Sequence, residues 1–184
     1  MAIQTFTSGQ ILTAADTNEY LANSGLVYVN SKTFSGSGTV SCTSFFNSTY
    51  DHYKIVMSCT SASASAQIVE TRLMVGASPT SGTTNYKYYE LGHTYSAGGA
   101  DAAAGSGGAY WFGFRSTDFF MGTMEIQNPY ASNYTTYQSR NVDSVQSVSS
   151  GGVHLLTTSY DGIQFLVGSG NLAGTVTCYG YRKP

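Results

Sequence analysis

The sequence predicts a mainly β, antiparallel fold, and three observations lead to this prediction. From Leu26 onward, apolar and polar residues alternate with a period of two, which is typical of strands with one buried face. Clusters of Gly, Ser, Asn and Pro separate these stretches at short intervals. The chain also has 15 Tyr and 9 Phe among its 184 residues, and aromatic residues favour strands. Many short strands at this spacing form a sandwich, a jelly roll or a barrel.

One short helix is expected before the strands, over residues 10–25. Thr13 is a suitable N-cap, and Asp16 lies three residues further on, where the helix dipole favours a carboxylate. Gly25 is a natural helix stop. Because a helix of about ten residues is marginal alone, it must dock on its own domain, on a sister chain or on another protein. We therefore divide the chain into an arm (1–25) and a β-domain (26–184).

The strands are assigned from alternation between turn signals. In the stretch 52–60, for example, Tyr53, Ile55 and Met57 share one face. The Gly/Ala-rich stretch Ser96–Ala109 is expected to be an exposed loop, because it can bury little apolar surface. The expected strands are Leu26–Phe34, Gly38–Thr43, His52–Thr60, Gln67–Val75, Tyr86–Tyr95, Ala109–Ser116, Phe120–Gln127, Thr135–Val142, Val153–Thr158, Gly162–Val167 and Gly174–Tyr181.

Composition excludes several classes of protein. Only 10% of residues are charged and the net charge is −2, so eight scattered cations cannot form the long basic stripe of a nucleic-acid binder. Hydrophobic residues make up 41%, which argues against disorder. No apolar run approaches the roughly 18 residues of a membrane helix. No basic segment followed by an apolar core opens the sequence, so no secretory signal is expected.

Reactive residues do not form a recognisable catalytic or metal-binding pattern. The three histidines are far apart in sequence and match no zinc spacing, and the carboxylates are single and scattered. The chain is therefore expected to have no metal, no cofactor and no enzymatic activity. Cys42, Cys59 and Cys178 are expected to be buried free thiols, while a Cys42–Cys59 bridge between neighbouring strands stays open.

Tyrosines crowd the middle of the chain, and two interpretations of them stay open. Tyr packs well on pleated sheets, so these residues can be ordinary strand residues. Tyr and Trp also make amphipathic contact surfaces that suit protein partners or sugar rings. Alternation places Tyr86 and Tyr88 on one face of their strand and Tyr89 on the other.

Three stretches resemble virion proteins of tailed bacteriophages. Residues 9–23, GQILTAADTNEYLAN, resemble the G-x-x-L-T-A-x-x-x-N opening of tail fibre and baseplate-associated chains. Residues 45–56, FFNSTYDHYKIV, followed by the strand around RLMV at 72–75, are similar to a β-sandwich module of cyanophage and related structural proteins. Residues 174–182, GTVTCYGYR, are similar to the last strand of such modules.

The resemblance implies a jelly-roll-like β-sandwich that assembles as a homotrimer in the host cytoplasm and resides in the virion. It implies a tail fibre or receptor-binding protein whose arm attaches to other virion proteins of the tail or baseplate and whose β-domain contacts a host surface glycan or protein. A trimeric capsid decoration (cement) protein is the alternative, and a carbohydrate-active enzyme is disfavoured because no catalytic pattern is present. The expected attachment residues are Leu12, Thr13, Asp16, Asn18 and Leu21. The candidate receptor contacts, with the Ser96–Ala109 loop, are Tyr86, Tyr88, Tyr89, Asp101, Trp111, Tyr134 and Tyr137.

Overall fold

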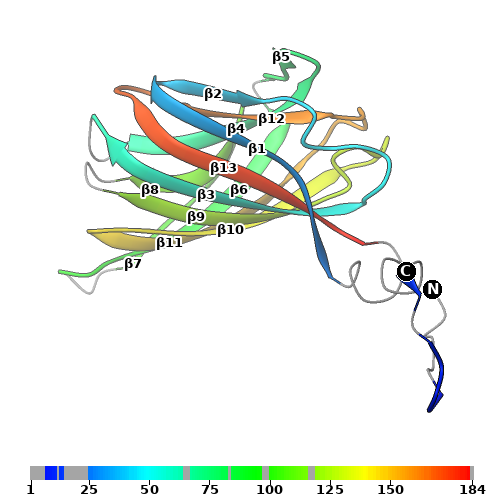
Figure 1. Cartoon of the computed structure of the whole chain (residues 1–184). Helices are drawn as coiled ribbons and strands as arrows, with labels where there is room; N and C mark the ends of the chain where they lie inside the picture. Colours follow the sequence, from blue (N-terminus) through cyan, green and yellow to red (C-terminus); the bar gives the residue numbers. More distant parts are fainter. Residues whose placement is uncertain are drawn as a thin grey trace.

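A computed structural model gives the arrangement of the β-domain (Figure 1). Its regular elements are strands throughout the part of the chain that it describes. Nearly all of the expected arm helix lies outside that part, so the helix stays a prediction. The attachment role of all five arm residues also stays a prediction, and Thr13, the one among them that is described, is exposed. The described residues are 7–11, 13–14, 25–63, 67–82, 84–96, 100–115 and 119–182.

Two antiparallel sheets form a β-sandwich, which confirms the predicted class (Figure 1). Sheet A has eight strands in the order β1 (Leu26–Ser37), β13 (Leu172–Tyr181), β3 (His52–Ala62), β9 (Phe120–Gln127), β10 (Thr135–Asp143), β11 (Gln146–His154), β6 (Tyr86–Thr94) and β7 (Ala100–Gly107). Sheet B has β2 (Thr39–Cys42), β12 (Gly162–Val167) and β4 (Gln67–Val75), and the far edge of β4 pairs with both β5 (Ser78–Pro79) and β8 (Tyr110–Arg115).

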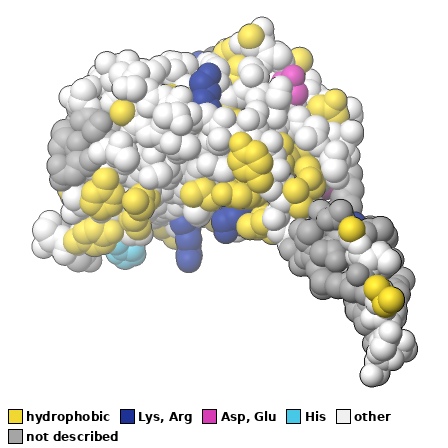
Figure 2. All heavy atoms as spheres, in the orientation of Figure 1, with side chains coloured by type: hydrophobic (Ala, Val, Ile, Leu, Met, Phe, Trp, Pro, Cys, Tyr) yellow, Lys and Arg dark blue, Asp and Glu magenta, His cyan; other side chains and the backbone are white. Residues whose placement is uncertain are grey.

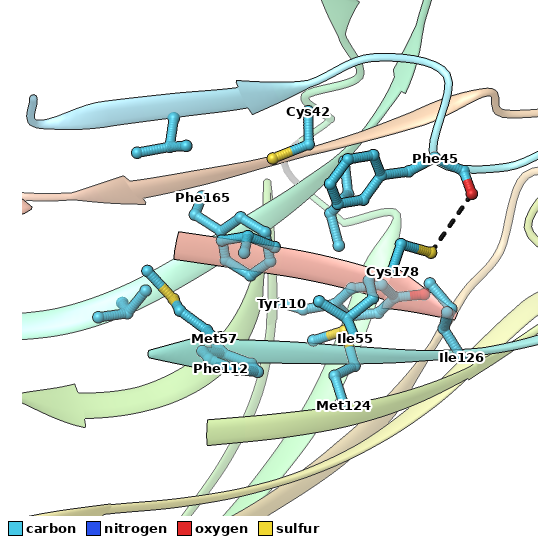
Figure 3. Packing of buried hydrophobic residues seen from close by; sticks show 14 of the residues in the cluster. Cys42, Phe45, Ile55, Met57, Tyr110, Phe112, Met124, Ile126, Phe165 and Cys178 are labelled. Atoms are coloured by element: carbon cyan, nitrogen blue, oxygen red, sulfur yellow. Dashed lines mark hydrogen bonds between the residues drawn. The ribbon is translucent and has the colours of Figure 1, made fainter. Parts of the chain in front are cut away.

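The core lies between the sheets and is built by the alternation seen in the sequence. Phe112 of β8 packs edge to face against Phe120 of β9 and Phe165 of β12, with ring centroids 5.6 and 5.4 Å apart. These rings join sheet B to sheet A, and all three are fully buried. Figure 3 shows Phe112 and Phe165 among inward side chains of β3 and β9, including Ile55 and Met124. Burial of this apolar surface is the main favourable contribution to folding.

The three cysteines are free and buried, as expected. Burial raises the pKa of Cys42 to about 12 and also raises the pKa of Cys178. The Cys178 thiol donates to the Phe45 carbonyl oxygen at 3.4 Å, as the dashed line in Figure 3 shows. The raised pKa keeps Cys42 and Cys178 in the thiol form, and the thiolate is the reactive form. Both are therefore structural residues.

Two expectations about the strands are wrong. Residues 100–107 do not belong to a loop but form the edge strand β7, which pairs with β6 from Tyr86↔Gly107 to His93↔Ala100. Small residues suit this edge, because a Cβ added at Gly105 would lie 3.0 Å from the Tyr88 hydroxyl oxygen. The strand expected over Val153–Thr158 in fact runs over Gln146–His154, where its serines and glycines pair with β10 and β6 on both sides.

Candidate functional site

One face of the eight-stranded sheet A points away from sheet B and is not covered by it. We use "outer face" for the outward side chains of β3, β9, β10, β11 and β6. Strand register places them in rows across the sheet. The polar row is Lys54, Glu125, Gln138, Gly151 and Tyr89. The middle row is Val56, Thr123, Arg140, Ser149 and Leu91. The next row is called the apolar row after its exposed Met121 and Val142, and it also contains Ser58, Ser147 and His93.

Hollows run along this outer face. One of about 970 Å³ is lined by residues of the middle and apolar rows, including the exposed side chains of Leu91, Met121 and Val142. Another, of about 380 Å³, is lined by residues of the polar and middle rows, including Tyr89 and Arg140. Figure 2 shows hydrophobic side chains next to a histidine at the lower left, with Lys or Arg side chains beside them.

Tyr89 lies over a glycine on the neighbouring strand. Gly151 of β11 is its register partner, and a Cβ added at Gly151 would lie only 2.9 Å from a carbon of the Tyr89 ring. The missing side chain therefore lets the ring approach the sheet surface. The Tyr89 side chain is still 45% exposed. Part of the aromatic ring is consequently available to a ligand.

The charges on the outer face are mostly positive. Among the described residues of the outer face, the cations are Lys54, Lys87 and Arg140, and the carboxylate is Glu125. Lys54 and Glu125 form an ion pair at 3.3 Å. Arg140 is exposed and has no hydrogen-bond or ion-pair partner among the described residues. Its guanidinium can therefore bind an anion from outside the chain.

The structure divides the predicted contact residues into several groups. Tyr89 and Tyr134 are exposed, and Tyr134 lies just before β10, in the connection from β9. Tyr88 is partly buried and packs against the core. Tyr86 and Tyr137 are 0% and 3% exposed, so their assignment as contacts is wrong. For Asp101 and Trp111 the strand positions are described but the side chains are not.

Tyr86 and Tyr137 belong instead to a buried aromatic cluster with Tyr110, His154 and Tyr160. The Tyr110 ring lies 4.6 Å from Tyr86 and 4.0 Å from Tyr137, measured between centroids. The Tyr110 hydroxyl donates to the Thr135 carbonyl oxygen at 3.0 Å. Burial lowers the pKa of His154, whose Nδ1 lies 3.2 Å from the Tyr160 hydroxyl oxygen. This cluster packs the sandwich and presents no surface to a partner.

Within the described ranges, no three His, Cys, Asp or Glu residues are grouped so that they could hold a metal ion. The described part of the chain contains no helix that is long and apolar enough to cross a membrane. The arrangement on the outer face offers an aromatic ring, a cation, hydroxyls and amides. Such groups can bind a ligand through packing and hydrogen bonds.

Sequence reasoning missed most residues of the outer face. Gln138 and Arg140 lie on an expected strand, where the signal in the sequence is weak because the buried positions include the polar Ser139 and Asn141. That signal gives no reason to place Arg140 beside Tyr89, because the two residues meet only through the register of β10, β11 and β6. Gly151 carries a weaker signal, since a glycine inside a strand often marks a close approach.

Comparisons with known proteins do not identify a family. No family model matches the chain, and no curated protein matches it. Among solved structures, the chain is similar to a protein of unknown function from Shewanella oneidensis MR-1. The identity is 7% and the TM-score is 0.32, with 96% of this chain and 97% of that chain covered. This similarity is too low to carry an argument about fold or function.

Proposed function

We propose that this chain is a structural protein of a phage virion, of the tail fibre or receptor-binding type. Its arm attaches it to the particle, and its β-domain contacts the host surface. The resemblance of residues 9–23, 45–56 and 174–182 to such proteins motivates the proposal. The observation that carries it in the structure is the outer face, which has hollows, an exposed tyrosine and a cation without a partner in the described chain.

The positions of the domain ends support separate attachment and contact regions. The backbone amide of Arg182 donates to the Gly25 carbonyl oxygen at 3.4 Å, so the chain enters β1 and leaves β13 at the same end (Figure 1). His52 and Gln127 lie in the row at this end. The apolar row with Met121 lies six residues further along β9, about 20 Å away. A chain anchored through residues 1–25 would thus present the apolar row furthest from its anchor, with the polar and middle rows between the two.

Immunogold labelling of the phage particles tests the location. Label at the tail is expected, whereas uniform label over the head would contradict the fibre assignment and support the decoration alternative. Deletion of residues 1–24 is expected to leave the β-domain folded but to block its incorporation into particles. Loss of folding on deletion would contradict the role of the arm as an attachment segment.

The proposed assembly is a homotrimer, as the resemblance implies. Sedimentation velocity of the full chain at micromolar concentration is expected to give three times the 19.5 kDa mass of one chain. A monomer at micromolar concentration would contradict this part of the proposal.

A further inference from the structure

We propose that the outer face of sheet A binds an acidic oligosaccharide. The Tyr89 ring packs against a sugar ring, and the Arg140 guanidinium pairs with a carboxylate of the ligand. The inference rests on the proposed function, since it names the class of receptor that the contact surface takes. Three features of the outer face carry it: the position of Tyr89, the lack of a partner for Arg140 among the described residues, and the sign of the charge.

Tyr89 supplies a flat apolar surface. Because Gly151 has no side chain, the ring lies against β11 instead of standing free in solvent. A ring held in this way loses little conformational freedom when a ligand packs on it. The C–H groups of a sugar ring are apolar on one side and suit an aromatic face, while the sugar hydroxyls need polar neighbours. Gln138 and Ser149, which line the same hollow, supply an amide and a hydroxyl.

Arg140 supplies a charge within reach of the same ligand. It lies two strands from Tyr89, about 10 Å across the sheet, and one row further along the strands, about 7 Å. Both residues line one hollow. Lys54 and Glu125 line that hollow as well and are paired with each other, so their charges offset. A planar guanidinium binds a carboxylate through two parallel hydrogen bonds, which a neutral sugar cannot provide. The site should therefore prefer sugars that carry a carboxylate.

Charge also argues against a second copy of the chain as the occupant. The outer face carries three cations and one carboxylate among its described outward residues, whereas the whole chain has a net charge of −2. Two outer faces packed against each other would bring like charges together, which disfavours association. An anionic ligand gains from the same charges. We therefore assign the face to an acidic glycan rather than to self-association.

Titration calorimetry on the full-length chain tests this inference with two acidic probes and their neutral counterparts. Pentagalacturonic acid is compared with maltopentaose, and sialyllactose with lactose. At least one acidic probe is expected to bind. Its neutral counterpart should bind about tenfold more weakly (about 1.4 kcal/mol) or not at all, because it lacks the charge-assisted pair with Arg140. Added salt should weaken the binding, since it screens exposed charges.

Variants locate the site. Arg140→Gln and Tyr89→Ala are each expected to weaken binding of the acidic probe about tenfold. Two changes on β1 serve as matched controls: Lys32→Gln removes the same charge, and Tyr28→Ala removes a tyrosine that is exposed on the same sheet. Both controls should bind within about twofold of the unchanged chain, which corresponds to well under 1 kcal/mol. Thermal melting checks that every variant is folded.

Several outcomes would overturn the inference. These are a folded chain that binds neither acidic probe, equal binding of acidic and neutral probes, or equal losses in the β1 controls. Self-association that Arg140→Gln abolishes would instead assign the face to a second copy. None of these outcomes changes the result of the immunogold labelling. If the label is at the tail and no sugar binds, the proposed function stands and only this inference is refuted.

Discussion

Two methionines on one strand allow a direct test of which side of sheet A is buried. Met124 of β9 is fully buried between the sheets, whereas Met121 on the same strand is 52% exposed on the outer face. Changing each to alanine is the same chemical change on opposite sides of one strand. Met124→Ala removes buried methylene and sulfur contacts and leaves a cavity, which costs about 2–5 kcal/mol. Met121→Ala leaves the core intact and should change stability by no more than about 0.5 kcal/mol.

Chemical denaturation of both variants measures this difference as a shift of the midpoint at constant slope. In thermal unfolding, each kcal/mol corresponds to about 2–4 °C for a chain of this size. A slip of one residue in the register of β9 would exchange the two faces. Equal losses of stability, or a larger loss for Met121→Ala, would therefore refute the assignment of the outer face.

The remaining predictions concern buried groups. Burial lowers the pKa of His154, so the unfolded chain binds a proton at this residue before the folded chain does as the pH falls below about 6.5. The free energy of unfolding should therefore decrease in this range. A smaller decrease between about pH 7 and pH 5.5 in a His154→Asn variant would confirm that His154 is the source. Tyr110→Phe should cost about 1–3 kcal/mol in urea unfolding, because it leaves the buried Thr135 carbonyl without its 3.0 Å donor. An unchanged midpoint would contradict that contact. Cys42 and Cys178 should react with a thiol reagent only after denaturation, since burial raises the pKa of both, and fast labelling of the folded chain would be the contrary result.

Several elements of the fold could be predicted from the sequence because local signals mark both of their ends. The strands Gln67–Val75, Phe120–Gln127 and Gly162–Val167 have the predicted bounds, since each alternates in polarity between clear turn residues. The strand Ala100–Gly107 could not be found in this way. Its glycines and alanines carry no alternation, and its conformation is determined by pairing with β6, which lies elsewhere in the chain.

The candidate site shows the same division between local and long-range information. Alternation correctly separates Tyr86 from Tyr89, but the sequence does not say which side of the strand meets the second sheet. That choice depends on the packing of sheet B, which buries Tyr86 and leaves Tyr89 exposed. The approach of Tyr89 to Gly151 and its nearness to Arg140 depend on register across three strands. Such long-range pairing has no signature in a single stretch of sequence.

The account depends most on the outer face of sheet A as the contact surface. Backbone amide chemical shifts of the isotope-labelled chain, followed while pentagalacturonic acid or sialyllactose is added, measure this residue by residue. The account predicts shifts concentrated on β9, β10, β11 and β6 around Arg140 and Tyr89, with β1 and sheet B unaffected. Shifts confined to sheet B, or no shift with either sugar, would contradict it.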